Sequence, residues 1–199
     1  MCSSNGEFWN GIACMALGDG GATVPRKRLH HLSVMFRAMS MLRPRGDPTA
    51  IAAVMFREMG QMTFTQKYLY DGGVSTDIVV DRMMRIIHHS CSRQDAESVR
   101  EKCTEICRRG GTGKKYWGSR VWAMLHHYAD LATEQHRPRV FYCIVACVCQ
   151  LLPCAECKGH CQRHLSKTGQ EILSTGPGDG PREWMSRFHD AVNERLTYQ

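Results

Sequence analysis

The sequence has little that would place the protein in a membrane, on nucleic acid or in a secretory pathway. Its longest mostly apolar run, residues 140–153, is about 14 residues long, whereas a membrane-spanning helix needs about 20. The first residues, MCSSNGEFWN, show no charged head followed by an apolar core, so we expect no secretory signal. The net charge of +7 is modest and is not gathered in a basic arm. We therefore expect neither a membrane nor a nucleic-acid partner.

Cysteine, by contrast, is abundant. The chain holds 11 cysteines in 199 residues, more than is usual for a cytosolic protein but too few per residue for a small disulfide-rich scaffold. Because the number is odd, at least one thiol cannot form a disulfide within the chain. The remaining composition, 43% apolar and 23% charged, is that of an ordinary folded protein. The role of so many thiols is the main question that the composition raises.

A glycine-rich segment divides the chain. Residues 108–115 read RRGGTGKK, and the three glycines interrupt any helix while the flanking charges favour solvent. The segment is superficially like a phosphate-binding loop, but Arg108 stands where that motif requires its first glycine. We therefore predict an N-terminal helical extension of unknown role over residues 1–110 and a second domain over residues 111–199.

The N-terminal region predicts an irregular start followed by short helices. Apolar residues recur there at helical spacing, and prolines, glycines and a threonine cap mark the ends of the segments. The expected helices span residues 29–39, 48–60, 76–87 and 92–106. The methionine-rich stripes on these helices are most simply core filler.

The C-terminal region is more regularly patterned. The expected helices span residues 117–133, 140–151, 153–167 and 181–196. Pro153 ends the second of these and can also occupy the first turn of the third, where proline is tolerated. Four helices with short connections predict a compact four-helix bundle, so the fold class is all-α.

The first candidate for chemistry is the pair Cys154 and Cys157. A spacing of three residues places both sulfur atoms on one helical face, close enough for a disulfide. The positive end of the helix dipole would stabilise a thiolate, chiefly at Cys154, and such a pair can exchange disulfides with another protein. Alone, the motif is equally compatible with half of a zinc site or with two buried thiols.

Zinc is the main alternative for this segment. His160, Cys161 and His164 follow the pair closely, so the segment is rich in metal-binding side chains. Ligands crowded on one continuous helix, however, do not readily surround a tetrahedral ion. We therefore assign no metal ligands and keep a zinc-stabilised, non-catalytic helical interaction module as an alternative.

Two further motifs lie on the first and last helices of the C-terminal region. Trp122 and His126 are four residues apart and share one helical face, as do His189 and Asn193. A flat heteroaromatic ligand could stack on an aromatic ring there, on Trp184 or His189, and take a hydrogen bond from Asn193. The simpler interpretation is core aromatic side chains with surface polar residues beside them.

Together, the three motifs resemble the Erv/ALR family of FAD-linked sulfhydryl oxidases. The family pattern W-G-x3-W-x2-L-H, then C-x-x-C, then W-x4-H-N-x-V-N-x-x-L is met here by WGSRVWAMLH, LLPCAEC and WMSRFHDAVNERL in the same order. The resemblance covers about residues 114–199. It implies a four-helix bundle with a short fifth helix that binds FAD.

The resemblance also implies roles for individual residues. Cys157 would lie nearest the flavin and Cys154 would exchange with an incoming thiol, so electrons would pass from a substrate dithiol to the pair, to FAD and then to O2, giving hydrogen peroxide. The implied cofactor-binding residues are Gly118, Arg120, Trp122 and His126 from the first helix and Trp184, His189 and Asn193 from the last.

Departures from the family pattern point toward its viral branch. Asp190 replaces the usual asparagine and Leu152 the usual aromatic residue, and no cysteine follows Cys161 to link the third helix to the fourth. Arg195 or the lysines at 114 and 115 would stand in for the family's basic residue near the phosphates. A viral member would act in the cytoplasm of the infected cell or in the virion, and a cellular one in the mitochondrial intermembrane space.

Many members of the family relay electrons through a second cysteine pair. Cys103 and Cys107, four residues apart on one helical face, are candidates, as are Cys2 and Cys14 near the start of the chain. The three cysteines of the central apolar helix, Cys143, Cys147 and Cys149, are more simply read as apolar packing.

The sequence thus predicts an FAD-dependent thiol oxidase that forms disulfides in substrate proteins. Its expected partners are O2 and thiol-containing proteins, such as a thioredoxin-like or viral structural protein, and a homodimer is a further candidate. Besides the zinc-stabilised module, one alternative remains, which is a degenerate family member that binds FAD but serves only as a scaffold.

Overall fold

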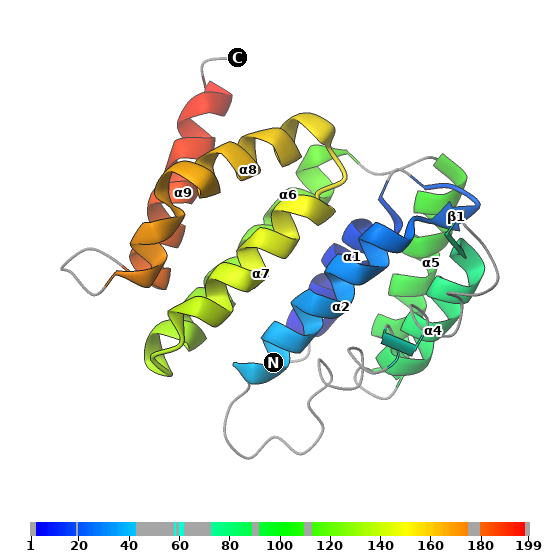
Figure 1. The fold of residues 1–199 in the computed structure, drawn as a ribbon. Helices are drawn as coiled ribbons and strands as arrows, with labels where there is room; N and C mark the ends of the chain where they lie inside the picture. The colour runs from blue at the N-terminus through cyan, green and yellow to red at the C-terminus, as the bar shows by residue number, and fades with distance from the viewer. Residues whose placement is uncertain are drawn as a thin grey trace.

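The computed structural model describes residues 3–18, 20–42, 58, 60–61, 73–88, 92–109, 113–174 and 180–197, and they form an all-α fold (Figure 1). The helices are α1 (Ser3–Leu17), α2 (Arg26–Met41), α4 (Thr76–His88), α5 (Arg93–Arg109), α6 (Lys114–Glu134), α7 (Pro138–Leu151), α8 (Ala155–Thr168) and α9 (Pro181–Thr197). A 3-10 turn, η1 (Gly169–Leu173), follows α8. The short strands β1 (Thr23–Val24) and β2 (Val74–Ser75) form an antiparallel ribbon. Across these described ranges, no helix is both long and apolar enough to cross a membrane.

The C-terminal helices form the bundle that the sequence predicts. α6 packs on α9, α7 packs on α8, and η1 contacts α7, α8 and α9. Pro138 occupies the first turn of α7, where a missing N–H costs nothing. Pro153 separates α7 from α8, and α8 begins two residues later than expected, at Ala155. This shift makes Cys154 the N-cap of α8.

The start of the chain differs from the expected irregular segment, because α1 is a helix of 15 residues. Its apolar side chains, among them Trp9, Ile12 and Met15, are almost completely buried. Such a helix has no polar face and therefore no helical periodicity for sequence analysis to detect. Gly11 lies close against α6, since a Cβ there would be only 3.1 Å from the Cβ of Arg120.

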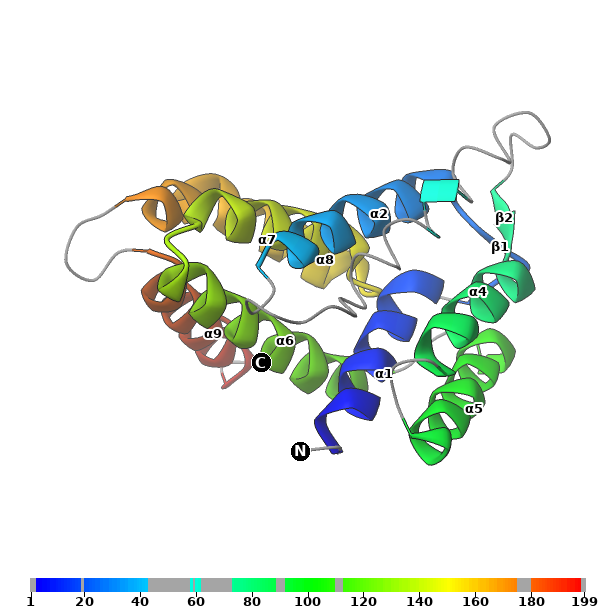
Figure 2. The ribbon, with the colours of Figure 1, turned by 90° about the horizontal axis from the view of Figure 1, so that it is seen from below.

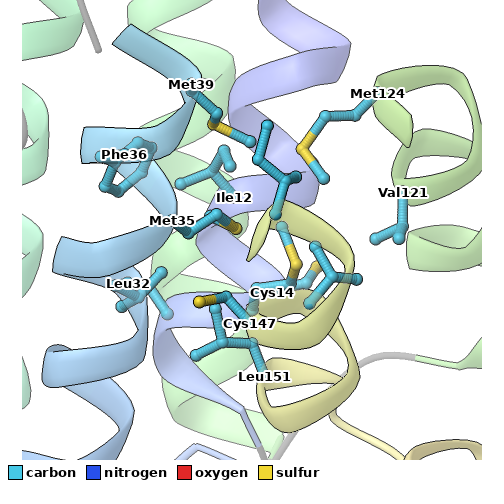
Figure 3. Packing of buried hydrophobic residues seen from close by; sticks show 14 of the residues in the cluster. Ile12, Cys14, Leu32, Met35, Phe36, Met39, Val121, Met124, Cys147 and Leu151 are labelled. Carbon is cyan, nitrogen blue, oxygen red and sulfur yellow. The ribbon is translucent and has the colours of Figure 1, made fainter. Parts of the chain in front are cut away.

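The N-terminal helices pack directly on the C-terminal bundle. α2 lies along α7, and α1 lies between α6 on one side and α5 on the other (Figure 2). Figure 3 shows side chains of α1, α2, α6 and α7 meeting in one core, with Met35 and Met39 of α2 facing the bundle. The methionine stripe of α2 is therefore core packing, as its pattern predicts.

Two sequence-based expectations lie outside the described residues. The expected helix over residues 48–60 falls there almost entirely, and so do residues 110–112 of the glycine-rich segment. The division into domains over residues 1–110 and 111–199 stays a prediction, to be weighed against a hydrophobic core that continues across it.

Candidate active site

Cys154 and Cys157 lie at the corner between α7 and α8. Cys154 is the N-cap of α8, and its Sγ accepts a hydrogen bond from the backbone N–H of Cys157 at 3.2 Å. Both side chains are half-buried thiols. An N-cap sulfur faces the unpaired N–H groups of the first helical turn. The local geometry therefore suits a dithiol that exchanges disulfides.

Arg28 of α2 holds this corner from the N-terminal side. Its Nη1 donates to the carbonyl oxygen of Met15 at 2.6 Å and to that of Leu151 at 2.9 Å. Those oxygens belong to the last turns of α1 and α7, where carbonyls lack partners within their helix and the dipole is negative. Gly18, at φ 63°, leaves room for the guanidinium, which lies 2.7 Å from where a Cβ would be.

A disulfide between Cys149 and Cys161 crosses the same corner. It joins the last turn of α7 to the middle of α8, so the zinc alternative for this segment loses the thiol of Cys161. The sequence-based interpretation of Cys149 as apolar packing was wrong on this point. The available signal was the pair's position on either side of Pro153, which ends one helix just before the next begins.

A second group of side chains joins α6 to α9. His126 Nε2 lies 3.0 Å from His189 Nδ1, and the Trp122 indole stacks on the His189 ring at 4.3 Å between centroids. Burial, followed by the nearby His126, lowers the pKa of His189 below its ordinary value, while Asp190 opposes the shift. The structure thus brings together three of the side chains implied for the cofactor, as half-buried aromatic rings with nitrogen donors and acceptors.

Trp184 is buried in the protein interior. It is 1% exposed, and its Nε1 donates to Thr168 Oγ1 at 2.9 Å. Its ring contacts Phe188 and His164, which themselves stack at 4.5 Å. With its N–H satisfied within the protein, Trp184 can support the site mainly by packing.

The other residues implied for cofactor binding, Arg120, Asn193 and Gly118, are not part of the aromatic group. Arg120 turns toward α1, where its Nη2 lies 3.0 Å from Glu7 Oε1, and its Nη1 donates to the carbonyl of Tyr116 at 2.6 Å. Asn193 is on the exposed side of α9. Apart from its own helix backbone and chain neighbours, no described atom lies within 4 Å of the place a Cβ would take at Gly118, so a ligand could approach the backbone there.

Arg195 connects the end of α9 with the first turn of α8. Its Nη1 lies 3.8 Å from Glu156 Oε1, an oxygen that is also 3.6 Å from His160 Nε2. This Nη1 is buried and has no hydrogen-bond acceptor among the described residues. His189 and Arg195 are six residues apart on α9, a rise of about 9 Å. Arg195 therefore links α9, which also carries His189, to the first turn of the helix that follows Cys154.

These features fit a planar cofactor with an anionic tail. Half-buried aromatic rings can stack on a flat ring system, and a buried guanidinium N–H without an acceptor suits a phosphate oxygen. Lys114 and Lys115 begin α6, but their side chains lie outside what the structure describes. Arg195 is thus a basic residue that the geometry supports, and Arg120, whose Nε is also buried without an acceptor among the described residues, is a second.

The cysteines considered as shuttle candidates have surroundings unlike those of Cys154 and Cys157. Cys103 is fully buried in α5, and burial raises its pKa to about 12, with further contributions from Cys107 and Cys14. Burial also raises the pKa of the half-buried Cys107. Cys14 is buried in α1, and Cys2 lies outside the described residues. A buried thiol with a raised pKa is a poor nucleophile, so exchange at Cys103 would require the helix to open.

Cys143 and Cys147 form a hydrogen-bonded pair of thiols on α7. The thiol of Cys147 donates to Cys143, which lowers the pKa of the half-buried Cys143 and raises that of Cys147. Within the described part of the chain, no three His, Cys, Asp or Glu side chains are grouped so that they could hold a metal ion. The zinc alternative therefore gains no site from the structure.

A comparison with known protein families places the C-terminal helices in context. The model of the Erv1 / Alr family matches residues 119–199, a stretch that includes the cysteine corner and the histidine pair. No curated protein and no solved structure matches the chain significantly.

Proposed function

We propose, from the match of residues 119–199 to the Erv1 / Alr family, that the protein is an FAD-dependent thiol oxidase that forms disulfide bonds in substrate proteins and passes the electrons to O2, giving hydrogen peroxide. The family is generally one of sulfhydryl oxidases. The observation that carries the proposal is the placement of Cys154 and Cys157 at the N-terminus of α8, inside the matched segment.

The exchange chemistry follows from this placement. In the oxidised protein, a substrate thiolate attacks Cys154 Sγ, which breaks the Cys154–Cys157 disulfide and leaves Cys157 as a thiolate. A second substrate thiolate then attacks the substrate sulfur of the mixed disulfide and releases Cys154. The substrate leaves with a disulfide, and the two enzyme cysteines are left reduced. The N–H groups of α8 stabilise the departing Cys154 thiolate.

The cofactor would be held between α6, α9 and the first turn of α8. Trp122, His126 and His189 would contact its ring systems, and Arg195 would pair with a phosphate. When bound, FAD supplies the two-electron acceptor that reoxidises a dithiol and the route by which the electrons reach O2. Trp184 would brace α9 from the interior through its contact with Thr168.

Oxygen uptake with dithiothreitol as the electron donor tests the proposal. The full-length protein should consume O2, and both Cys154→Ser and Cys157→Ser should abolish this turnover while the protein keeps its yellow flavin colour. Cys143→Ser changes another half-buried thiol outside the corner and should retain turnover. If both corner variants keep full turnover, the assignment of the redox pair is wrong.

The same preparation separates the alternatives. A colourless protein that contains zinc would favour the zinc-stabilised interaction module, and a yellow protein without oxygen uptake would favour the scaffold.

The proposed physiological partners are thiol-containing proteins, such as a thioredoxin-like or viral structural protein, with homodimerisation as a further proposal. For a viral chain the proposed location is the infected cell's cytoplasm or the virion, and for a cellular chain the mitochondrial intermembrane space.

A further inference from the structure

The N-terminal half of α2 lies against the corner that carries the proposed redox pair. Arg28 Nη1 binds the carbonyl oxygen of Leu151, three residues before Cys154. His31, one turn later on α2, is close enough to Lys158 of α8 for their charges to interact. A part of the chain outside the family match therefore borders the proposed point of entry for substrate thiols.

The side chains that α2 presents there are basic. Lys27 and His30 are exposed and His31 is half-buried, while Lys158 follows Cys157 directly. Burial, followed by His30, Lys27 and Lys158, lowers the pKa of His31 and favours its neutral form, so the positive charge here comes from the two lysines. We call these four residues, Lys27, His30, His31 and Lys158, the basic rim.

The nearest acidic residue of α8 faces the other way. Glu156 and Lys158 are two residues apart, which turns their side chains about 200° from each other around the helix axis. Glu156 interacts with His160 and Arg195 on the side of α9. Its charge is therefore balanced within the bundle, while Lys158 is directed toward α2.

We propose that the basic rim selects polypeptide substrates whose cysteines are flanked by aspartate or glutamate. The inference rests on the proposed thiol-oxidase function and adds the substrate class to it. Like-signed charges beside a reactive group attract oppositely charged partners, speed their encounter and fix their orientation. The rim belongs to both α2 and α8, so the N-terminal region contributes directly to substrate choice.

A pair of matched peptides tests the proposal. Both contain the same two cysteines, flanked by aspartates in one peptide and by lysines in the other, and kcat/KM is measured by oxygen uptake. The acidic peptide should be preferred at least about 5-fold at low ionic strength, and the preference should shrink with added salt. Lys27→Glu should reduce or reverse the ratio, and Arg139→Glu is its control.

Arg139 is an exposed cation at the other end of α7, about 18 Å along the helix from Leu151. Its reversal changes the net charge by the same amount as Lys27→Glu but leaves the rim intact. An equal effect of both variants would show that total charge, not the rim, sets the preference, and would overturn the proposal. A ratio near one in the unchanged protein would overturn it as well.

A flavin-independent measurement separates this inference from the proposed function. In Cys157→Ser, the Cys154 thiolate attacks each peptide supplied as a mixed disulfide with thionitrobenzoate, which forms the Cys154–peptide disulfide and releases coloured thionitrobenzoate. Faster reaction with the acidic peptide, lost in a combined Lys27→Glu/Cys157→Ser variant, supports the rim even if oxygen uptake fails. Equal rates for both peptides overturn the rim, while dithiothreitol oxidation in the unchanged protein decides the function separately.

Discussion

The cysteines of this protein differ in chemistry because their surroundings differ. Cys154 caps a helix at a half-buried corner, so its sulfur meets backbone N–H groups. Cys103 is enclosed in the core, where burial raises its pKa to about 12 and keeps it a neutral thiol. Residue type alone therefore does not identify a redox-active cysteine, and position at a helix N-terminus is the more informative feature.

His189 offers a test of cofactor binding by a single side chain. Replacing His189 with alanine removes both the contact with His126 and the ring that stacks on Trp122, so FAD should be held more weakly. We expect at least about a 10-fold rise in the dissociation constant, equivalent to about 1.4 kcal/mol. Titration of the flavin-free protein with FAD measures this change.

His127→Ala is the matched control, because His127 is the exposed neighbour of His126 on α6. It removes an imidazole from α6, the helix that carries His126, and leaves His189 on α9 unchanged. Equal FAD affinity in His189→Ala and in the unchanged protein would contradict the proposed position of the cofactor. A similar loss in both variants would indicate a general disturbance of the packing between α6 and α9, not the loss of a cofactor contact.

Among the elements, the corner between α7 and α8 is restrained by several contacts. Pro153 separates the helices, Arg28 binds the last turn of α7, and the Cys149–Cys161 disulfide ties α7 to α8. Each contact restrains a different part of the corner. The proposed redox pair would thus be carried on a backbone that these contacts restrain.

Removing the disulfide should lower the free energy of unfolding. The bond closes a loop with a sequence separation of 12 residues, for which chain-entropy arguments give about 3 kcal/mol as the expected loss. The double variant Cys149→Ala/Cys161→Ala avoids leaving a lone thiol, and urea denaturation of the flavin-free protein measures the change. Cys143→Ala/Cys147→Ala removes two thiols from the same region without removing a disulfide, and its smaller loss gives the baseline. Equal losses would contradict a stabilising role for the bond.

In the molecule as a whole, the N-terminal helices complete the core of the bundle. α2 covers α7 with Leu32, Met35 and Met39, and α1 packs on α6 with Gly11 at the close approach (Figure 3). Without residues 1–110, these faces of α6 and α7 would be exposed to water. Exposed apolar surface of this kind destabilises a domain and promotes association.

A chain limited to residues 111–199 should therefore be less stable than the full-length protein. We expect a lower melting temperature and increased binding of a hydrophobic dye, because the α7 face that α2 covers becomes accessible. Thermal unfolding and dye fluorescence of both chains, measured without flavin, provide the comparison. Equal melting temperatures and no dye binding would instead support two independent domains divided at residue 110.

Local sequence was enough to locate most of the C-terminal helices and the cysteine pair at a helix start. Pro138 and Pro153 mark helix boundaries through their fixed backbone angle and missing N–H, and the spacing of apolar residues shows which side is buried. These are properties of neighbouring residues. The same reasoning missed α1, because a helix buried on most sides carries no periodic signal.

Contacts between distant segments required the folded chain. The pairing of Cys149 with Cys161 depends on how α7 and α8 meet, and the bond from Arg28 to Leu151 joins residues 123 positions apart. The ion pair between Arg120 and Glu7 also depends on the folded chain, because α1 supplies a carboxylate that is distant from Arg120 in the sequence. Helix formation is governed by interactions within a few turns, whereas the surroundings of the candidate site come from packing, which sets α2 against the end of α7, next to the start of α8.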